Sequence, residues 1–180
     1  RYIGDWSSDV CSSDLSGVNL AMTRLRARSV KGQRAYSSKP SKRGRNVSII
    51  GALGLNGLVA DYSLMGATDG LTFEAFISQT LVPKLWKGAC VVMDNCSVHL
   101  GETVRQLIEA AGAQLIYLPP YSPDFSPIEN CWSKPKNSLR RIGARTYPEL
   151  AKAIEEAFSE VSLDYIRGWF THCCYCTSED

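Results

Sequence analysis

The chain has 180 residues, of which 44% are hydrophobic and 21% are charged, so it can bury one substantial core and we expect a single domain. No apolar run reaches 18 residues and no basic stretch leads into an apolar one at the start, so neither a membrane span nor a secretory signal is indicated. Seven cysteines without regular spacing argue against a disulfide framework, and we expect reduced thiols and a cytoplasmic location.

Residues 1–15, RYIGDWSSDVCSSDL, differ from the rest because Ser and Asp dominate and no regular hydrophobic period is present. They resemble the translation of a common sequencing-library adapter, and such a segment is excluded from fold reasoning. We therefore predict that residues 1–15 are non-native and outside the core, and that the natural N-terminus has been lost. Residues 16–180 are then the folded domain.

Nine basic residues and no acidic one stand between Arg24 and Arg45, although the net charge is only +2. Such a block suits a polyanion, because a Lys or Arg that meets a phosphate releases counterions from nucleic acid. A solvated, mobile loop explains the same composition equally well. The residues that we predict to bind nucleic acid are Arg24, Arg26, Arg28, Lys31, Arg34, Lys42, Arg43 and Arg45.

The first regular elements are predicted from residue 47 onward. Residues 47–55 form an apolar, β-branched run that ends at Asn56-Gly57, a dipeptide typical of tight hairpin turns, and residues 58–64 return as a second strand. Apolar positions between residues 72 and 86 keep to one helical face and predict a helix. Residues 89–93 are continuously apolar, as in a strand that is covered on both faces.

The second half of the chain continues the alternation. Residues 104–111 predict a helix closed by Gly112, and residues 114–118 predict a strand. Four prolines make residues 119–127 a stiff, extended connection, and the Ser126-Pro127-Ile128-Glu129 pattern predicts a helix start with a capping box. A last helix opens at Thr146 with the same pattern. These elements indicate an α/β domain with a mixed sheet.

Two acidic residues occupy positions that suit cation binding. Asp94 ends the buried strand, and a carboxylate there projects into the crevice where α/β sheets bind ligands. An Asp that only caps a loop explains this position as well, and a capping box alone accounts for Glu129. Taken singly, neither acid settles the function.

The frame around these two acids is more specific. VVMDNCSVH at residues 91–99 and YLPPYSPDFSPIENCW at residues 117–132 resemble the signature of mariner-superfamily transposases of the insertion-sequence type. The 34 residues between Asp94 and Glu129 equal the family's spacing between its second and third acids. The similarity covers about residues 14–176 and includes the Trp169-Phe170 and His172-Cys173 pairs.

The resemblance implies a ribonuclease H-like fold with a mixed five-stranded sheet flanked by helices, and an Asp-Asp-Glu triad acting on double-stranded DNA. It also implies two Mg²⁺ or Mn²⁺ ions held by Asp94, Glu129 and the first acid, since phosphodiester transfer uses paired hard cations with oxygen ligands. Asp14 matches the first acid, although Leu15 replaces the family's Glu and the polar residues before Asp14 predict a damaged or missing first strand. Asn95, His99 and Asn130 are possible supporting residues, with a lesser role for His99.

We therefore predict a DNA transposase catalytic domain that cleaves and transfers strands, in a chain that is poorly active and lacks the family's helix-turn-helix region. A homodimeric, bacterial-type parent that works at the nucleoid follows from the resemblance. Two alternatives stay open, namely a non-catalytic remnant that binds DNA through its basic block and a ribonuclease H-like nuclease that acts on RNA or hybrids. A zinc site at His172, Cys173 and Cys176 is not expected, because no second Cys pair accompanies it.

Overall fold

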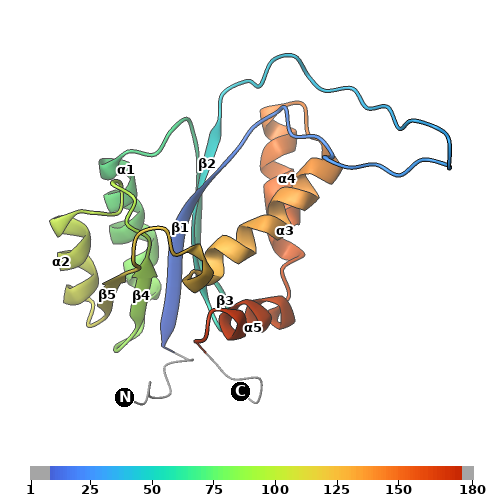
Figure 1. Ribbon diagram of the computed structural model, residues 1–180. Helices are drawn as coiled ribbons and strands as arrows, with labels where there is room; N and C mark the ends of the chain where they lie inside the picture. The colour runs from blue at the N-terminus through green and yellow to red at the C-terminus, as the bar shows by residue number, and fades with distance from the viewer. Residues whose placement is uncertain (1–8, 176–180) are drawn as a thin grey trace.

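The computed structural model describes residues 9–175, in which five strands form one mixed sheet (Figure 1). The sheet order is β3-β2-β1-β4-β5. Strand β2 is antiparallel to both β1 and β3, and β4 is parallel to both β1 and β5. The predicted mixed five-stranded sheet is confirmed. The strand bounds are β1 Val10–Val18, β2 Val47–Gly54, β3 Gly57–Met65, β4 Cys90–Met93 and β5 Gln114–Tyr117.

The central strand is β1, so the expectation of a damaged or missing first strand is wrong. Val10 and Cys11 are fully buried, and the small side chains of Ser12 and Ser13 fit into the interior beside them. Backbone pairing with β2 on one side and β4 on the other holds β1 whatever its side chains are. The hydroxyls of Ser13 and Ser16 are nevertheless buried without a hydrogen-bond partner.

The β2–β3 hairpin forms as predicted, but its turn lies one residue earlier. Gly54 pairs with Gly57, which leaves Leu55 and Asn56 as the two connecting residues. Gly57 has φ +133, a backbone conformation that favours glycine. The dipeptide Asn56-Gly57 therefore marks the turn without supplying both of its central residues.

One face of the sheet is covered by α1 (Gly70–Phe76) and α2 (Glu102–Ala110), as Figure 1 shows. The predicted helix over residues 72–86 starts at α1 under an Asp69 cap, widens into a π-helical turn at Ile77–Leu81 and ends in a tight 3-10 turn at Val82–Lys84. Apolar side chains of this segment pack on the sheet, among them Phe73, Phe76, Ile77 and Leu81.

The other face is covered by α3 (Pro127–Ile142), α4 (Tyr147–Ser159) and α5 (Leu163–His172). The predicted capping box of α4 is confirmed, with Thr146 and Glu149 bonded reciprocally. Helix α5 was not predicted from the sequence as a separate helix. Ser162 caps its start, and Phe170 then packs into the core formed by all three helices and β1.

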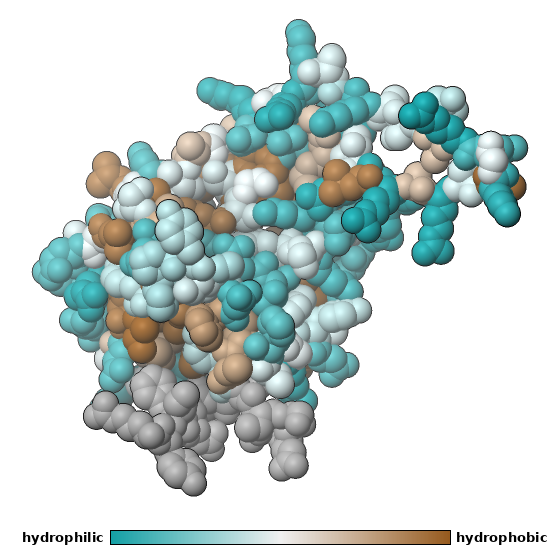
Figure 2. Space-filling model, in the orientation of Figure 1, coloured by the Kyte–Doolittle hydropathy of each residue, from teal (hydrophilic) through white to brown (hydrophobic). Residues whose placement is uncertain are grey.

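An exposed loop joins β1 to β2 and projects from the body of the domain (Figure 1). We call residues 19–46 the arm; most of their side chains are exposed, and teal hydrophilic side chains cover the projection in Figure 2. The nine basic residues therefore face solvent as a group. No helix within residues 9–175 is long and apolar enough to cross a bilayer.

Candidate active site

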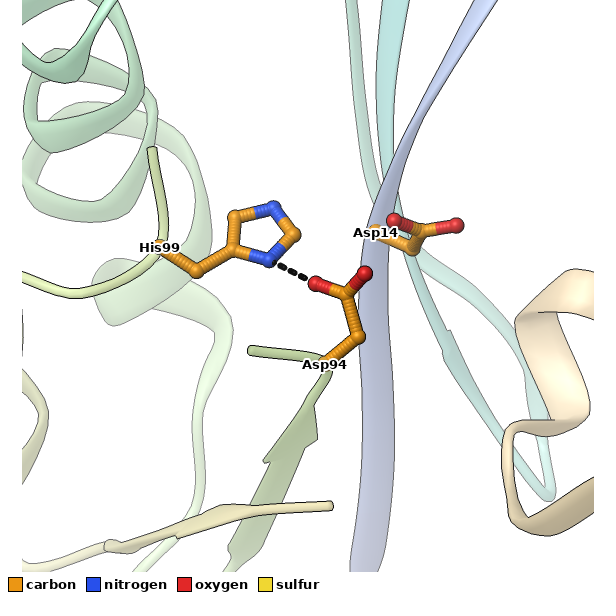
Figure 3. A group of neighbouring side chains, drawn as sticks. All are labelled: Asp14, Asp94 and His99. Carbon is orange, nitrogen blue, oxygen red and sulfur yellow. Dashed lines mark hydrogen bonds and ion pairs between the residues drawn. The ribbon is translucent and has the colours of Figure 1, made fainter. Parts of the chain in front are cut away.

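Asp14 and Asp94 are brought together by two adjacent parallel strands. Ser12 of β1 pairs with Val92 of β4, and continuing that register by two residues sets Asp14 beside Asp94. One oxygen of each carboxylate lies within 4.8 Å of the other and of a ring nitrogen of His99 (Figure 3). These two acids, 80 positions apart along the chain, form the centre of the candidate site.

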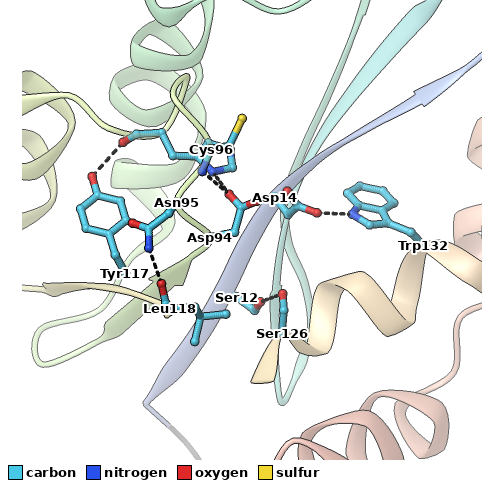
Figure 4. Close-up of polar contacts among 10 residues, drawn as sticks. Ser12, Asp14, Asp94, Asn95, Cys96, Tyr117, Leu118, Ser126 and Trp132 are labelled. Carbon is cyan, nitrogen blue, oxygen red and sulfur yellow. Dashed lines mark hydrogen bonds and ion pairs between the residues drawn. The ribbon is translucent and has the colours of Figure 1, made fainter. Parts of the chain in front are cut away.

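The Asp94 carboxylate is held in place through its Oδ1 atom. His99 Nδ1 lies 2.5 Å from this oxygen, and the backbone N–H of Cys96 donates to it over 3.1 Å (Figure 4). The other oxygen lies on the side of Asp14 in Figure 3. Asp94 is thus oriented with one oxygen left for a ligand.

His99 itself is fixed by its surroundings. Its side chain is fully buried, its ring centroid lies 4.6 Å from that of Phe73, and its backbone carbonyl accepts a hydrogen bond from the Tyr117 hydroxyl at 2.8 Å. The Nε2 atom has no partner among residues 9–175. His99 therefore acts on the site only through Nδ1, which locks the Asp94 rotamer.

Asp14 is buried in the middle of β1 and faces α3. Trp132 Nε1 donates to Asp14 Oδ2 over 3.0 Å. Burial raises the pKa of Asp14 to about 7, with the charges of Glu129 and Asp94 adding to the rise and the Trp132 hydrogen bond opposing it. The charges of Asp94 and Glu129 therefore disfavour ionisation of Asp14.

The indole of Trp132 can reach Asp14 because the facing residue of β2 is a glycine. Gly51 pairs with Asp14, and a Cβ atom on Gly51 would lie 3.0 Å from Trp132 Cη2 and 3.3 Å from Ile128 Cδ1. Any larger residue at this position would push α3 and its indole away from the sheet.

Glu129 lies in the first turn of α3, and the predicted capping box there is not formed. The Ser126 side chain makes no cap hydrogen bond and instead has its hydroxyl 3.4 Å from that of Ser12 on β1. Within residues 9–175, no hydrogen bond or ion pair holds the Glu129 carboxylate, which is exposed. A capping role therefore does not explain this acid.

Asp94 and Glu129 line one cleft of about 590 Å³, whose far wall is the proline-rich connection. That connection is less extended than predicted, because Pro123–Phe125 forms a tight turn before α3. Tyr121 stands on the cleft wall with φ 58 and a fully exposed side chain. The acids thus face an open space with room for a sugar-phosphate unit.

The three acids have no Lys or Arg counterpart. In the described part of the chain, none of Asp14, Asp94 and Glu129 pairs with a Lys or Arg, and His99 is the one ring that forms an ion-pair contact with Asp94. Clustered carboxylates of this kind repel one another unless a cation lies among them. Oxygen donors are what Mg²⁺ and Mn²⁺ prefer, so this donor set fits a divalent cation.

The remaining predicted site residues make their hydrogen bonds to groups other than the acids. Asn95 donates to the Leu118 carbonyl over 2.6 Å at the edge of the cleft, and the Asn130 amide lies 3.5 Å from Cys173 Sγ, toward α5. The basic residues of the arm lie on the projecting loop. Cys176 of the considered zinc cluster lies outside the described residues.

Three contributors to the site were missed by sequence reasoning, namely the Trp132 donor, the Gly51 clearance and the Ser12 contact. Trp132 was predicted to be core, and it is, with 3% of its surface exposed. The sequence contains one indication of the Trp132 donor, because the N–H of a buried indole requires a hydrogen-bond acceptor and Trp132 follows Glu129 by three residues. Nothing local in the sequence marks Gly51 or Ser12.

A mixed sheet with adjacent carboxylates on its central strand and on that strand's parallel neighbour, faced by a third from a helix, defines an α/β domain suited to metal-assisted phosphodiester chemistry. Residues 9–151 match the sequence model of the DDE superfamily endonucleases. The chain belongs to this family.

Solved structures with the same ribonuclease H-like fold include those of Mos1 transposase. The paired-end complex with left transposon end matches at TM-score 0.77 and 15% identity over 93% of this chain and 53% of that one. The mariner Mos1 paired end complex with Mg gives 0.71 and 16% over 92% and 52%, and the catalytic domain of Mos1 mariner transposase gives 0.64 and 12% over 93% and 78%. The chain thus spans about half of the full transposase chains. A comparison with curated protein sequences finds no match.

Proposed function

We propose that this chain is the catalytic domain of a DNA transposase, in which Asp14, Asp94 and Glu129 form the triad for DNA strand cleavage and strand transfer. The observation that carries the proposal is the convergence of these acids. Asp14 and Asp94 lie within 4.8 Å of each other, and Glu129 shares a cleft with Asp94 and contributes to the raised pKa of Asp14.

The triad is proposed to hold two Mg²⁺ or Mn²⁺ ions, for which Asp14, Asp94 and Glu129 would be the ligands. Bound there, the ions would lower the pKa of a water or a DNA 3′-hydroxyl and stabilise charge on the leaving oxygen. The Mg-containing Mos1 paired end complex supports a divalent cation for this fold.

The protein's own contribution is to fix where the carboxylates stand. His99 orients Asp94, Trp132 holds one oxygen of Asp14, and the proline-rich wall sets the start of α3 that carries Glu129. Because these ligands are placed before a cation arrives, less ordering free energy is lost on binding.

The proposed substrate is double-stranded DNA, both transposon ends and target, as the DNA in the Mos1 paired-end complex suggests for this fold. We further propose an insertion-sequence parent of bacterial type that acts in the cytoplasm at the nucleoid. Two DNA ends have to be held together in transposition, which favours a homodimer of the parent protein.

We also propose that residues 1–15 are non-native, and that the part of them within β1 replaces a natural strand of similar backbone geometry. The buried, unpaired hydroxyl of Ser13 supports this, because such a group costs about 1–3 kcal/mol and is uncommon in a native central strand. The proposed domain boundary at residue 16 concerns origin alone, since β1 belongs to the sheet.

The decisive experiment is Mg²⁺-dependent nicking and strand transfer by the full chain on supercoiled duplex DNA, with calorimetry of Mg²⁺ binding beside it. We expect weak cleavage and strand transfer that Asp94→Ala and Glu129→Gln abolish, together with loss of Mg²⁺ binding. Lys152→Gln, on the exposed face of α4, is the control and should change neither readout.

The alternatives give different results in the same assays. A DNA-binding remnant would bind DNA in a salt-dependent way, with no cleavage and no effect of Mg²⁺ or of Glu129→Gln. A ribonuclease H-like nuclease would hydrolyse an RNA-DNA hybrid without joining strands. Either result would overturn the proposed transposase activity.

A further inference from the structure

A strongly basic groove lies between the root of the arm and the C-terminal half of α3. It consists of two adjoining hollows that share Leu25 and Arg140. No acidic side chain lines either hollow in the described part of the chain. We call this feature the arm–helix groove, and its basic lining residues are Arg24, Arg26, Lys39, Arg43, Lys136, Arg140 and Arg141.

Helix α3 connects this groove directly to the candidate active site. Glu129, Ser133, Lys136 and Arg140 follow one another at intervals of four, three and four residues, so they share one helical face. Each of them keeps some solvent exposure, whereas Leu139 and Trp132 turn into the core. The exposed stripe is therefore acidic at the catalytic end and basic at the other.

The groove is held open by fixed contacts at the root of the arm. Arg145 Nη1 donates to the carbonyls of Leu20 and Met22 over 3.1 and 3.2 Å. The backbone N–H of Arg45 donates to the Tyr147 hydroxyl over 2.6 Å. These contacts tie the arm's ends to the start of α4, so the body of the domain fixes the arm's side of the groove.

Charge distribution sets Lys136 and Arg140 apart from an ordinary solvated face. Arg141 already pairs with Glu160 across to the end of α4. In the described residues, neither Lys136 nor Arg140 has an acidic partner, and the arm brings further cations toward them. Such a concentration of like charge destabilises the free protein and is relieved by a polyanion.

We propose that the arm–helix groove binds the phosphate backbone of duplex DNA whose scissile end lies at Asp14, Asp94 and Glu129. This placement of the DNA rests on the proposed function. Glu129 and Arg140 are eleven positions apart, which is about 16 Å along a helix axis. Duplex DNA rises by 3.4 Å per base pair, so the contacted phosphates lie about five base pairs from the scissile phosphate. The contacts are to the backbone and carry no base specificity.

The test compares Lys136→Gln/Arg140→Gln with the control pair Lys87→Gln/Lys152→Gln, which are exposed basic residues outside the groove. Affinity for a 30-base-pair duplex is measured across a salt series with the full chain. Lys136→Gln/Arg140→Gln, the groove pair, should reduce the magnitude of the slope of log affinity against log salt concentration by about 2. Each lost phosphate contact removes about 0.9 from this slope. The control pair should leave the slope within experimental error of wild type.

Position is tested with duplexes that carry a single methylphosphonate at successive distances from a pre-cut 3′ end. For the wild-type chain, affinity should fall when the neutral phosphate stands about five base pairs from the end, and for the groove pair this minimum should vanish. An unchanged salt slope, equal effects in both pairs or a minimum elsewhere overturns the groove site. Thermal melting of both pairs excludes misfolding as the cause.

These experiments distinguish failure of the proposed function from failure of the groove. DNA binding does not require cleavage, so the salt dependence of binding reports on the groove even in Asp94→Ala. If the Lys136→Gln/Arg140→Gln variant shows the expected smaller salt dependence but the wild-type chain shows no affinity minimum near the 3′ end, only the five-base-pair placement is overturned. Cleavage that survives Asp94→Ala overturns the triad and leaves the groove's salt slope as it was.

Discussion

Trp132 Nε1 lies 3.0 Å from Asp14 Oδ2, so an indole from the helix that carries Glu129 holds the carboxylate of the central strand. The bond joins residues 118 positions apart and is buried. It opposes the pKa increase that burial causes at Asp14. This contact therefore orients Asp14 and, together with the backbone hydrogen bond at Leu15, favours its ionised form against burial.

Trp132→Phe removes this donor while keeping an aromatic ring in the core. Because the pKa of Asp14 then rises further above about 7, we expect the Mg²⁺ concentration for half-maximal cleavage at pH 7 to increase by about tenfold per pKa unit. The difference in this Mg²⁺ concentration between variant and wild type should shrink at pH 8.5, where Asp14 is ionised in either protein. Trp169→Phe is the control, and a difference that does not change with pH would contradict the mechanism.

Asp14 also predicts how stability depends on pH without metal. Its folded pKa of about 7 exceeds the ordinary aspartate pKa of 3.8, so the native state binds more protons than the unfolded state between these pH values. Ionising the buried Asp14 therefore lowers the free energy of unfolding. This loss is absent below about pH 4, grows as pH rises, and is complete above about pH 7, where it is on the order of 4 kcal/mol.

Denaturant unfolding in EDTA at pH 5 and pH 8 measures this effect. The wild-type chain should be less stable at pH 8, and Asp14→Asn should remove most of the difference, since the amide does not titrate. Added Mg²⁺ should restore wild-type stability at pH 8 by neutralising the acids. Equal pH dependence in Asp14→Asn would show that another group is responsible.

Ser12 and Ser13 are neighbours in β1 that should respond oppositely to the same change. Ser13→Ala removes a buried hydroxyl without a partner and should stabilise the chain by about 1 kcal/mol, whereas Ser12→Ala loses the contact with Ser126 and should destabilise it by a similar amount. Thermal melting should separate the two variants by several degrees. Destabilisation by both would mean that the Ser13 hydroxyl has a partner.

Gly51→Ala tests the clearance under Trp132. The new Cβ atom would stand 3.0 Å from the indole and 3.3 Å from Ile128, so we expect a loss of about 1–3 kcal/mol from overpacking. Weaker Mg²⁺ binding should follow as α3 moves away from Asp14. Gly17→Ala is the matched control in β1, because its added Cβ meets nothing within 4 Å. Equal losses in both variants would exclude the indole contact as the cause.

Local patterns predicted most elements from β2 onward because each follows from chain neighbours alone. Alternation and apolar runs gave β2, β3 and β4, and the Thr146 capping box gave α4. Local patterns did not predict β1, because this serine-rich strand has no hydrophobic periodicity. Backbone hydrogen bonds to β2 and β4 hold β1 in the sheet, and such pairing between distant segments cannot be inferred from one segment alone.

The sequence by itself determined Asp94, Glu129 and the spacing between them, because these belong to motifs that are contiguous along the chain. Only the tertiary structure decided that Asp14 stands beside Asp94, that Ser126 bonds to Ser12 in place of capping α3, and that Gly51 makes room for Trp132. Each of these depends on strand register or on packing across the sheet. Such relationships arise from the spatial convergence of distant segments, which local propensity does not encode.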